Sequence, residues 1–151
     1  MCIRDSQNSS FNNIGNDAID ISGSKVIIND IKISSAGDKG ISVGERSNLY
    51  AKNIKISDAF IGFASKDFSS VGIENLEVKN VSICLAAYQK KAEYGPGSIN
   101  LKDSNSICEK NYIREKGSSI KLSGYDLLTN SSSAYEELYS LDWTIYEWNN
   151  L

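Results

Sequence analysis

The chain has 151 residues, 40% of them hydrophobic, and a formal net charge of −3, which suits a single globular domain. The mild negative charge argues against a nucleic acid or an anionic membrane as partner, since both select a basic surface. No apolar run is long enough to span a bilayer. The sequence contains no histidine, which excludes Ser-His and Cys-His catalysis and every histidine-ligated metal site.

The first six residues stand apart from the rest of the chain. The coding sequence expected for MCIRD (1–5) resembles a transposon adapter used in sequencing libraries. We therefore predict that residues 1–6 are an artefact and leave them out of the fold prediction. The beginning of the chain then carries no information on export.

From residue 16 onward the sequence repeats itself. Each repeat begins with an alternating apolar and polar pattern, found at 16–24, 38–47, 61–70 and 83–91. In the first three repeats a second alternating pattern follows, at 25–34, 48–57 and 71–80. Alternation is typical of half-buried strands, and self-similarity at a fixed period indicates a solenoid.

Apolar residues recur at matching positions, as expected for side chains stacked inside a solenoid. Ile19, Ile41, Phe63 and Leu85 follow one another at steps of 22 residues. Two further columns contain Val26/Ile28, Leu49/Ala51 and Val71/Ile73, and Ile31/Ile33, Ile54/Ile56 and Leu76/Val78. Three short strands per turn predict an all-β fold, a right-handed single-stranded parallel β-helix of about six coils. A leucine-rich repeat is excluded because no helical arm or recurrent Leu/Asn pattern is present.

Polar residues recur at the expected corners between strands. Such residues hydrogen-bond local backbone and tolerate left-handed conformations, so stacked copies can form side-chain ladders. One predicted structural ladder contains Asp30, Asn53 and Asn75, and a second contains Ser24, Ser47 and Ser69.

The pattern becomes irregular after Lys91. A loop at 92–97 carries the only proline, and Ile99–Leu101 and Ile120–Leu122 resemble further strands. We predict a β-helix over 7–129. Residues 130–151 then form a Ser-rich hinge and an acidic aromatic segment with Trp143, Tyr146 and Trp148. This segment is either a cap on the last coil, with a short helix at 134–141, or a linker to a truncated next segment.

Two cysteines, Cys84 and Cys108, occur in the same SIC context and are expected one coil apart. The spacing of neighbouring strands makes a disulfide feasible, but stacked free thiols are the favoured interpretation. No Cys-x-x-Cys spacing exists, so a zinc site is not expected.

A family resemblance rests on GNDAIDISGS (15–24), GDKGISVGE (37–45), GFASKDFS (62–69) and the corner Asn column. With these segments the chain resembles the right-handed parallel β-helix, or pectate-lyase-like, superfamily. More narrowly, GDKGISVGE, ASKD and YQKKAEYGP (88–96) are similar to β-helix regions of bacterial surface proteins that accompany a CotH-kinase-like domain. This resemblance implies an extracellular or cell-surface location and other domains in a longer parent chain. It transfers no functional residue.

Members of this superfamily often bind acidic polysaccharides on the outer side of the first strand. The predicted outer columns there would make a shallow groove from Asp20, Ser42, Lys66, Tyr88 and Lys90. In a lyase, Lys66 would be the base, and Lys39 or Lys90 would neutralise the uronate carboxylate. ASKDFS is similar to the Lys-Ser segment of chondroitinase-B-like lyases. Their arginine motif and paired calcium-binding glutamates have no counterpart here, so solvated lysines are the favoured interpretation.

Carboxylates offer two further hypotheses, neither of them favoured. Asp17 and Asp20 could pair as acid and base, although turn formation and an exposed strand position explain them better. Calcium could bind Asp38 with Glu45 or Asp17, but no loop has a dense acidic spacing. We therefore predict no cofactor and no resident metal ion.

The sequence thus predicts a non-catalytic β-helix module of a bacterial exported or cell-surface protein, with a structural or carbohydrate-contacting role. One alternative is a polysaccharide lyase that cuts uronate-containing chains with Lys66 as base. Another is a unit that self-assembles end to end through uncapped coils.

Overall fold

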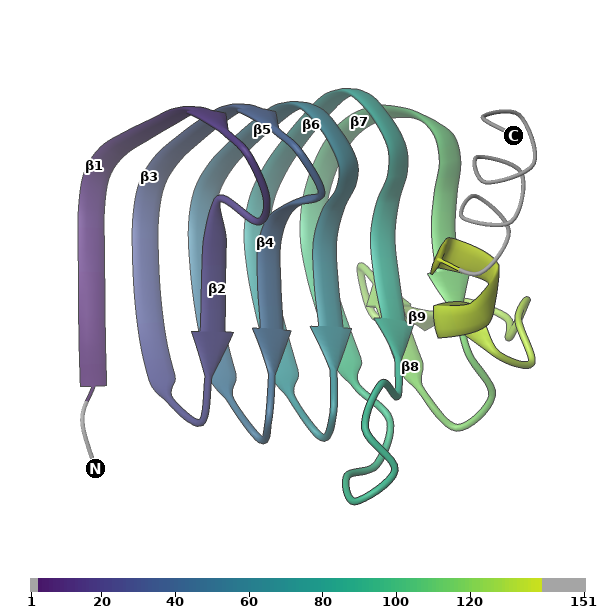
Figure 1. The fold of residues 1–151 in the computed structure, drawn as a ribbon. Helices are drawn as coiled ribbons and strands as arrows, with labels where there is room; N and C mark the ends of the chain where they lie inside the picture. Colours follow the sequence, from purple (N-terminus) through teal and green to yellow (C-terminus); the bar gives the residue numbers. More distant parts are fainter. Residues whose placement is uncertain (1–2, 140–151) are drawn as a thin grey trace, which may run out of the picture.

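The computed structural model describes residues 3–139, and strands dominate this part of the chain (Figure 1). The strands are β1 (Ile3–Ile14), β2 (Ile19–Ser22), β3 (Lys25–Ala36), β4 (Lys39–Gly44), β5 (Asn48–Lys66), β6 (Ser70–Tyr88), β7 (Ser98–Arg114), β8 (Ser119–Leu122) and β9 (Tyr125–Asp126).

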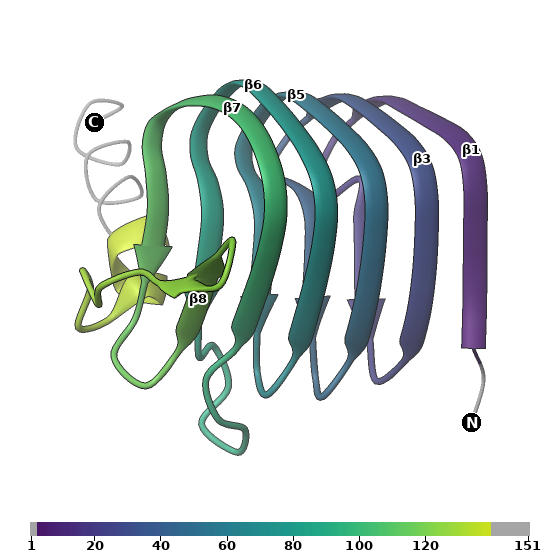
Figure 2. The same ribbon diagram turned by 180° about the vertical axis from the view of Figure 1, so that it is seen from behind.

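The strands wind into a right-handed parallel β-helix of about five turns (Figure 1). Each coil pairs in parallel with the next: Ile19 of β2 faces Ile41 of β4, and Ile41 faces Phe63 of β5. On the other side of the molecule, β1, β3, β5, β6 and β7 lie side by side in this order (Figure 2). The predicted fold class is confirmed.

The structure has about five turns, one fewer than the sequence predicted, because the sixth coil stops after its first strand. Residues Ser119–Leu122 form β8 and pair in parallel with Ser98–Leu101 of β7. Beyond Leu122 the chain turns through Ser123 and Gly124, both with positive φ, and β9 pairs antiparallel with β8. The parallel ladder therefore ends at β8.

The interior contains the apolar columns that the repeat predicted. The column through Ile31, Ile54 and Leu76 is buried in all three coils, and Ile28, Ala51, Ile73 and Leu101 form another buried column. Full burial of one such Ile or Leu side chain stabilises the fold by about 1.5–3 kcal/mol. Stacked apolar columns are therefore the main source of stability.

The strands are longer than predicted. Three short strands per turn were expected, but β5 and β6 each run for 19 residues around the corners. Asn53 and Asn75 stand at one such corner with φ of 54° and 61°. A single left-handed residue turns the backbone, and pairing continues on both sides of it, as in Lys52–Glu74 and Ile54–Leu76. The corner thus bends the strand without interrupting it.

The fifth coil differs from the coils before it, because serines replace apolar residues. Ser104 follows Leu76, and Ser106 follows Val78, in columns that are otherwise apolar in β3, β5 and β6. The two serine hydroxyls hydrogen-bond each other at 2.7 Å. Beside them a hollow of about 700 Å³ opens above the buried side chains of Leu76 and Leu85. End-to-end self-assembly, through the end of the solenoid near the fifth coil or through the opposite end, stays a prediction.

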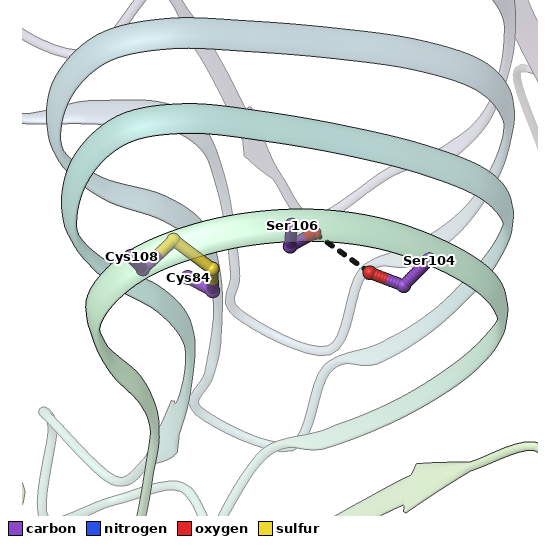
Figure 3. Close-up of a disulfide and its surroundings, with 4 residues drawn as sticks. All are labelled: Cys84, Ser104, Ser106 and Cys108. Carbon is purple, nitrogen blue, oxygen red and sulfur yellow. Dashed lines mark hydrogen bonds between the residues drawn. A yellow bond between two sulfur atoms is a disulfide. The ribbon is translucent and has the colours of Figure 1, made fainter.

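A disulfide joins Cys84 of β6 to Cys108 of β7, with Cα atoms 5.8 Å apart (Figure 3). The favoured sequence interpretation, two stacked free thiols, was wrong. The two cysteines lie one coil apart as expected, but Cys108 faces Val81, and the register shifts between Lys79 and Val81. This shift places Cys108 within bonding reach of Cys84.

One corner of the solenoid carries a longer loop than its neighbours. Between β5 and β6 the corner has three residues, 67–69, whereas between β6 and β7 it has nine, 89–97. The strands on either side stay in register, since Lys66 faces Tyr88 and Ser70 faces Ser98. The additional residues therefore form a surface loop and leave the coils unchanged.

After β9 the chain forms a helix at 134–139 on the flank of the solenoid (Figure 1). Residues 140 and 141 of the predicted helix, and Trp143, Tyr146 and Trp148, lie outside the described residues. Strand β1 begins at Ile3, and the artificial origin of residues 1–6 stays a prediction. Within residues 3–139 no helix has the length and apolar character of a membrane span.

Candidate functional site

The predicted groove lies on the outer side of the first strand of each coil, here called the first-strand face (19–22, 41–44, 63–66 and 85–88). The register aligns Asp20, Ser42, Ala64 and Ala86 in one column. Asp20 is exposed, but the other three are buried. An open groove at this position was therefore a wrong prediction.

The helix at 134–139 contributes to this burial. Ala134 and Leu138 pack in one apolar cluster with strand residues from the third to the fifth coil, namely Ile61, Ala64, Ile83, Ala86, Tyr88 and Ile113. The sequence predicted a cap over the last coil, whereas the helix covers the flank of several coils. The small side chains of Ala64 and Ala86 had instead suggested a groove for a ligand.

Side-chain contacts from Glu115, the residue after β7, and from the hinge hold the beginning of this helix. The backbone N–H of Ala134 donates to Glu115 at 3.1 Å, and Ser131 donates its hydroxyl to Glu137 at 2.6 Å. A carboxylate that accepts a helix N-terminal N–H satisfies a group that the helix itself leaves unpaired. Residues 131–139 thus form a strap over the first-strand face.

Lys39 lies beneath Tyr139, the last described residue of the strap. Its ammonium contacts Asp38 and, at 3.3 Å, Asp17, and it lies 5.2 Å from the ring centroid of Tyr139. Burial disfavours the charge of Lys39, but the hydrogen bond to Asp38 and the attraction of both carboxylates outweigh burial and raise its pKa. Lys39 is therefore held as an ammonium and is not free to neutralise a substrate.

Two tyrosines complete this polar cluster. The Tyr139 hydroxyl donates to the Asp38 carboxylate, 3.2 Å from each oxygen, and burial followed by the negative charge of Asp38 raises the Tyr139 pKa. Tyr88 is buried, and its hydroxyl has no hydrogen-bond partner among residues 3–139. Burial also raises the Tyr88 pKa. Both tyrosines are therefore neutral, and neither is a base.

Lys66 has a different environment from Lys39. Its ammonium donates to the Ser42 hydroxyl at 2.9 Å, its side chain lies against Gly44, and no carboxylate among the described residues forms an ion pair with it. Burial, followed by the repulsion of Lys39 and Lys90, lowers the Lys66 pKa. Of the three lysines named from the sequence, Lys66 is thus the one with the properties of a base.

Lys90 and the predicted calcium ligands are not joined into a site. Lys90 is exposed, with its ammonium 5.7 Å from the Tyr135 ring centroid. Asp17 and Asp38 contact Lys39, whereas Glu45 contacts Lys91 and Ser22. The described part of the chain contains no cluster of three metal-binding side chains. The residues proposed for calcium therefore serve ion pairs.

The corner residues form the ladders that their positions suggested. Asn53 donates its amide to Asp30 at 3.0 Å, and Asn75 donates to Asn53 at 2.8 Å. In the serine column, the N–H of Ser24 donates to the Ser47 hydroxyl at 3.1 Å, and the N–H of Ser47 donates to Ser69 at 3.2 Å. These side chains hold neighbouring coils together and take no part in the first-strand face.

A further corner ladder was missed from the sequence. Its members all have positive φ, and Asn80 donates its amide to Asp58; the column contains Asn13, Ser35, Asp58 and Asn80. Their spacing of 22 or 23 residues was a usable signal.

These features define the class of the protein as a parallel β-solenoid with a packed flank and a disulfide-bonded last coil. No protein-family model, curated protein or solved structure matches the chain.

Proposed function

We propose that this chain is a non-catalytic β-helix module of a bacterial exported or cell-surface protein, with a structural and carbohydrate-contacting role. The observation that carries the proposal is the packing of the first-strand face. Ala64, Ala86 and Tyr88 are buried in a cluster with the strap, and Lys39 is bound to Asp17 and Asp38. These four side chains of the predicted groove are therefore used for packing and ion pairing.

The disulfide between Cys84 and Cys108 supports export. Disulfides form and persist in oxidising compartments and are rare in reducing cytosol. The superfamily resemblance suggested the same location, and the disulfide supports it from independent chemistry.

The test of this proposal is an assay for product together with an assay for binding. The purified chain is incubated with alginate, pectate and a glycosaminoglycan, and unsaturated products are followed by ultraviolet absorbance. Retention on gels that contain the same polymers measures binding. We expect retarded migration without product. Product formed by the parent chain, and lost in Lys66→Ala, would overturn the non-catalytic assignment.

A uronate lyase is the second candidate, and the environment of Lys66 favours it. A lowered pKa leaves more of the Lys66 amine unprotonated near neutral pH, as a general base requires. The amine would take the proton from the carbon beside the carboxylate. The glycosidic C–O bond would then break as the C=C bond forms, and the leaving oxygen would take a proton from water. The strap would have to move first, and Lys90 would have to neutralise the carboxylate.

A further inference from the structure

Aromatic and cationic side chains cluster at the corner that follows the first strand of the second, third and fourth coils. The cluster contains Arg46, Phe68 and Tyr94, of which Arg46 and Phe68 are exposed and Tyr94 is half-buried, and we call it the aromatic corner. Phe68 is 57% exposed. The chain has four phenylalanines, and such an apolar side chain is ordinarily buried. The corner lies beyond the end of the first-strand face, and the strap makes no described contact with it.

The backbone of Phe68 is unfavourable for such a residue. Its φ is 62°, in the left-handed region, where a bulky side chain is a genuine outlier. Arg46, at the equivalent position one coil earlier, has a φ of 59°. Residues that keep such strain without burying their side chain often serve a function. Asn or Gly would suit this φ better. An exposed aromatic ring is thus held at this corner in spite of an unfavourable backbone conformation.

The nine-residue loop at 89–97 is fixed against this ring. The buried carboxylate of Asp67 accepts the N–H groups of Lys90 and Lys91, both at 2.8 Å, and Lys91 contacts Glu45. The N–H of Phe68 donates to the Gly95 carbonyl at 2.9 Å. A Cβ on Gly95 would lie 2.5 Å from the Phe68 ring, so only glycine allows this close approach.

Arg46 adds a positive charge to the two rings. Its guanidinium carbon lies 5.9 Å from the Phe68 centroid and 5.6 Å from the Tyr94 centroid, within the range of cation–π attraction. Arg46 is exposed, and no carboxylate among residues 3–139 forms an ion pair with it. The corner therefore presents aromatic surface beside a guanidinium that can bind a carboxylate in bidentate fashion.

A row of polar side chains continues from the corner along the solenoid. Register places one amide or hydroxyl per coil in this row, which contains Asn48, Ser70, Ser98 and Ser119. Neighbouring strands are spaced by about 4.8 Å, which is close to the length of one pyranose unit. An extended sugar chain can therefore meet a hydrogen-bonding group at each unit.

We propose that the aromatic corner binds a glycan that contains a carboxylated sugar. One sugar ring packs on Phe68 and Tyr94, its carboxylate pairs with Arg46, and the following units run along the polar row. This inference rests on the carbohydrate-contacting part of the proposed function and gives it a location and a ligand class. The site is separate from the first-strand face and requires no movement of the strap.

The test measures calorimetric binding of two probes, a polygalacturonate hexamer and the neutral maltohexaose. The variants are Phe68→Asn and Arg46→Asn, because Asn tolerates the left-handed backbone at both positions. The matched control is Tyr50→Ala, which removes an exposed aromatic side chain elsewhere on the surface. We expect the parent and Tyr50→Ala to bind the acidic hexamer at least tenfold more tightly than the neutral one. Both corner variants should lose at least tenfold in affinity for the acidic hexamer.

Thermal unfolding separates binding from structure. Phe68→Asn should leave the Tm unchanged or higher, because it relieves backbone strain while it removes the ring. A lower Tm with unchanged binding would overturn the inference, as would equal affinity for the two hexamers. If the parent binds and the corner variants bind equally well, this inference alone fails. If the parent binds neither hexamer and no acidic polymer gel, carbohydrate contact itself fails.

Discussion

The middle coils and the fifth coil show two ways of holding a β-helix together. In the middle coils, Ile54 and Leu76 fill the interior, and the Asn53–Asn75 hydrogen bond joins the corners. In the fifth coil the same interior column holds Ser104, which lines a hollow, and a disulfide ties the coil to the one before it. Both coils have the same backbone geometry but differ in what stabilises them.

This difference shows that register and stability are separable in a solenoid. The backbone of β7 pairs with β6 from Ser98 to Arg114 with one shift in register. Pairing holds although Ser104 and Ser106 replace interior apolar side chains. Backbone pairing supplies the register, while apolar burial or a covalent bond supplies the free energy. The middle coils should therefore fail when their side chains are changed, and the fifth coil should fail when its disulfide is removed.

The largest expected effect comes from making a middle coil resemble the fifth. Leu76→Ser removes a fully buried side chain and buries a hydroxyl, and should lower the free energy of unfolding by about 3–5 kcal/mol. The reciprocal variant, Ser104→Leu, places an apolar side chain in the hollow and should change stability by less than about 1 kcal/mol. Urea unfolding followed by circular dichroism measures both. Equal losses in the two variants would remove the distinction between the coils.

Removal of the disulfide should have the next largest effect. The double variant Cys84→Ala/Cys108→Ala releases a constraint across 24 residues of sequence and should cost about 2–4 kcal/mol. Thermal unfolding of the parent with and without dithiothreitol provides the comparison, because reduction should lower its Tm and leave the Tm of the double variant unchanged. A parent Tm that does not respond to complete reduction would contradict the role given to the bond.

The corner ladder should contribute less than either. Asn53→Leu breaks hydrogen bonds to Asp30 and from Asn75 and places a bulky residue at positive φ, and should cost about 1–3 kcal/mol. Asn53→Gly is the matched control, since it suits the backbone and removes only the amide. Its loss in urea unfolding should be smaller. If Asn53→Gly lowers the free energy of unfolding more than Asn53→Leu does, the positive φ at this corner does not contribute as described.

A smaller effect is expected at the strap. Tyr139→Phe removes the hydroxyl that contacts Asp38 and should cost about 0.5–1.5 kcal/mol, with faster proteolytic cleavage between 127 and 133. Tyr135→Phe is the control, because no hydrogen bond involves its hydroxyl among the described contacts. Limited proteolysis with mass spectrometry measures both. Identical cleavage rates would show that the Asp38 contact does not hold the strap.

The smallest effect concerns pH at the loop of the aromatic corner. Hydrogen bonds from Lys91 and Ser22 lower the pKa of Glu45 below its ordinary value of 4.5. A lowered carboxyl pKa contributes stability that is present above the unfolded value and is lost as pH falls through the folded value. The protection factors of amides 89–97, which correct for the intrinsic pH dependence of exchange, should therefore fall below pH 4.5 in the parent. In Glu45→Gln this fall should be weaker, and an unchanged pH dependence of protection would contradict the assignment.

The sequence predicted the fold because a parallel β-helix repeats its own pattern. Ile41 and Phe63 occupy one interior column by the same rule of alternation and spacing, and no long-range information is needed to align them. The turn count was too high because the strand that contains Ile120 and Leu122 forms as predicted but is not followed by the rest of a coil. The reversal at Gly124 depends on a short turn that the period does not encode.

The candidate site was harder to predict, since it depends on a contact between distant parts of the chain. Tyr139 reaches Asp38 across 101 residues, and nothing near Ala64 or Ala86 indicates that a helix will cover them. The disulfide shows the same difficulty. The repeat predicted that Cys84 and Cys108 lie one coil apart, but their bonding depends on a register shift at the corner.

Hydrogen exchange of the parent chain, with and without reductant, tests the central claim most directly. The middle coils are held by apolar columns and the fifth coil by the disulfide, so only the fifth coil should lose protection when the disulfide is reduced. We predict that reduction accelerates exchange at 102–113 by at least tenfold, while amides of 49–56 and 71–78 stay protected. Loss of protection in all coils together, or slow exchange at 102–113 after complete reduction, would contradict this distribution of stability.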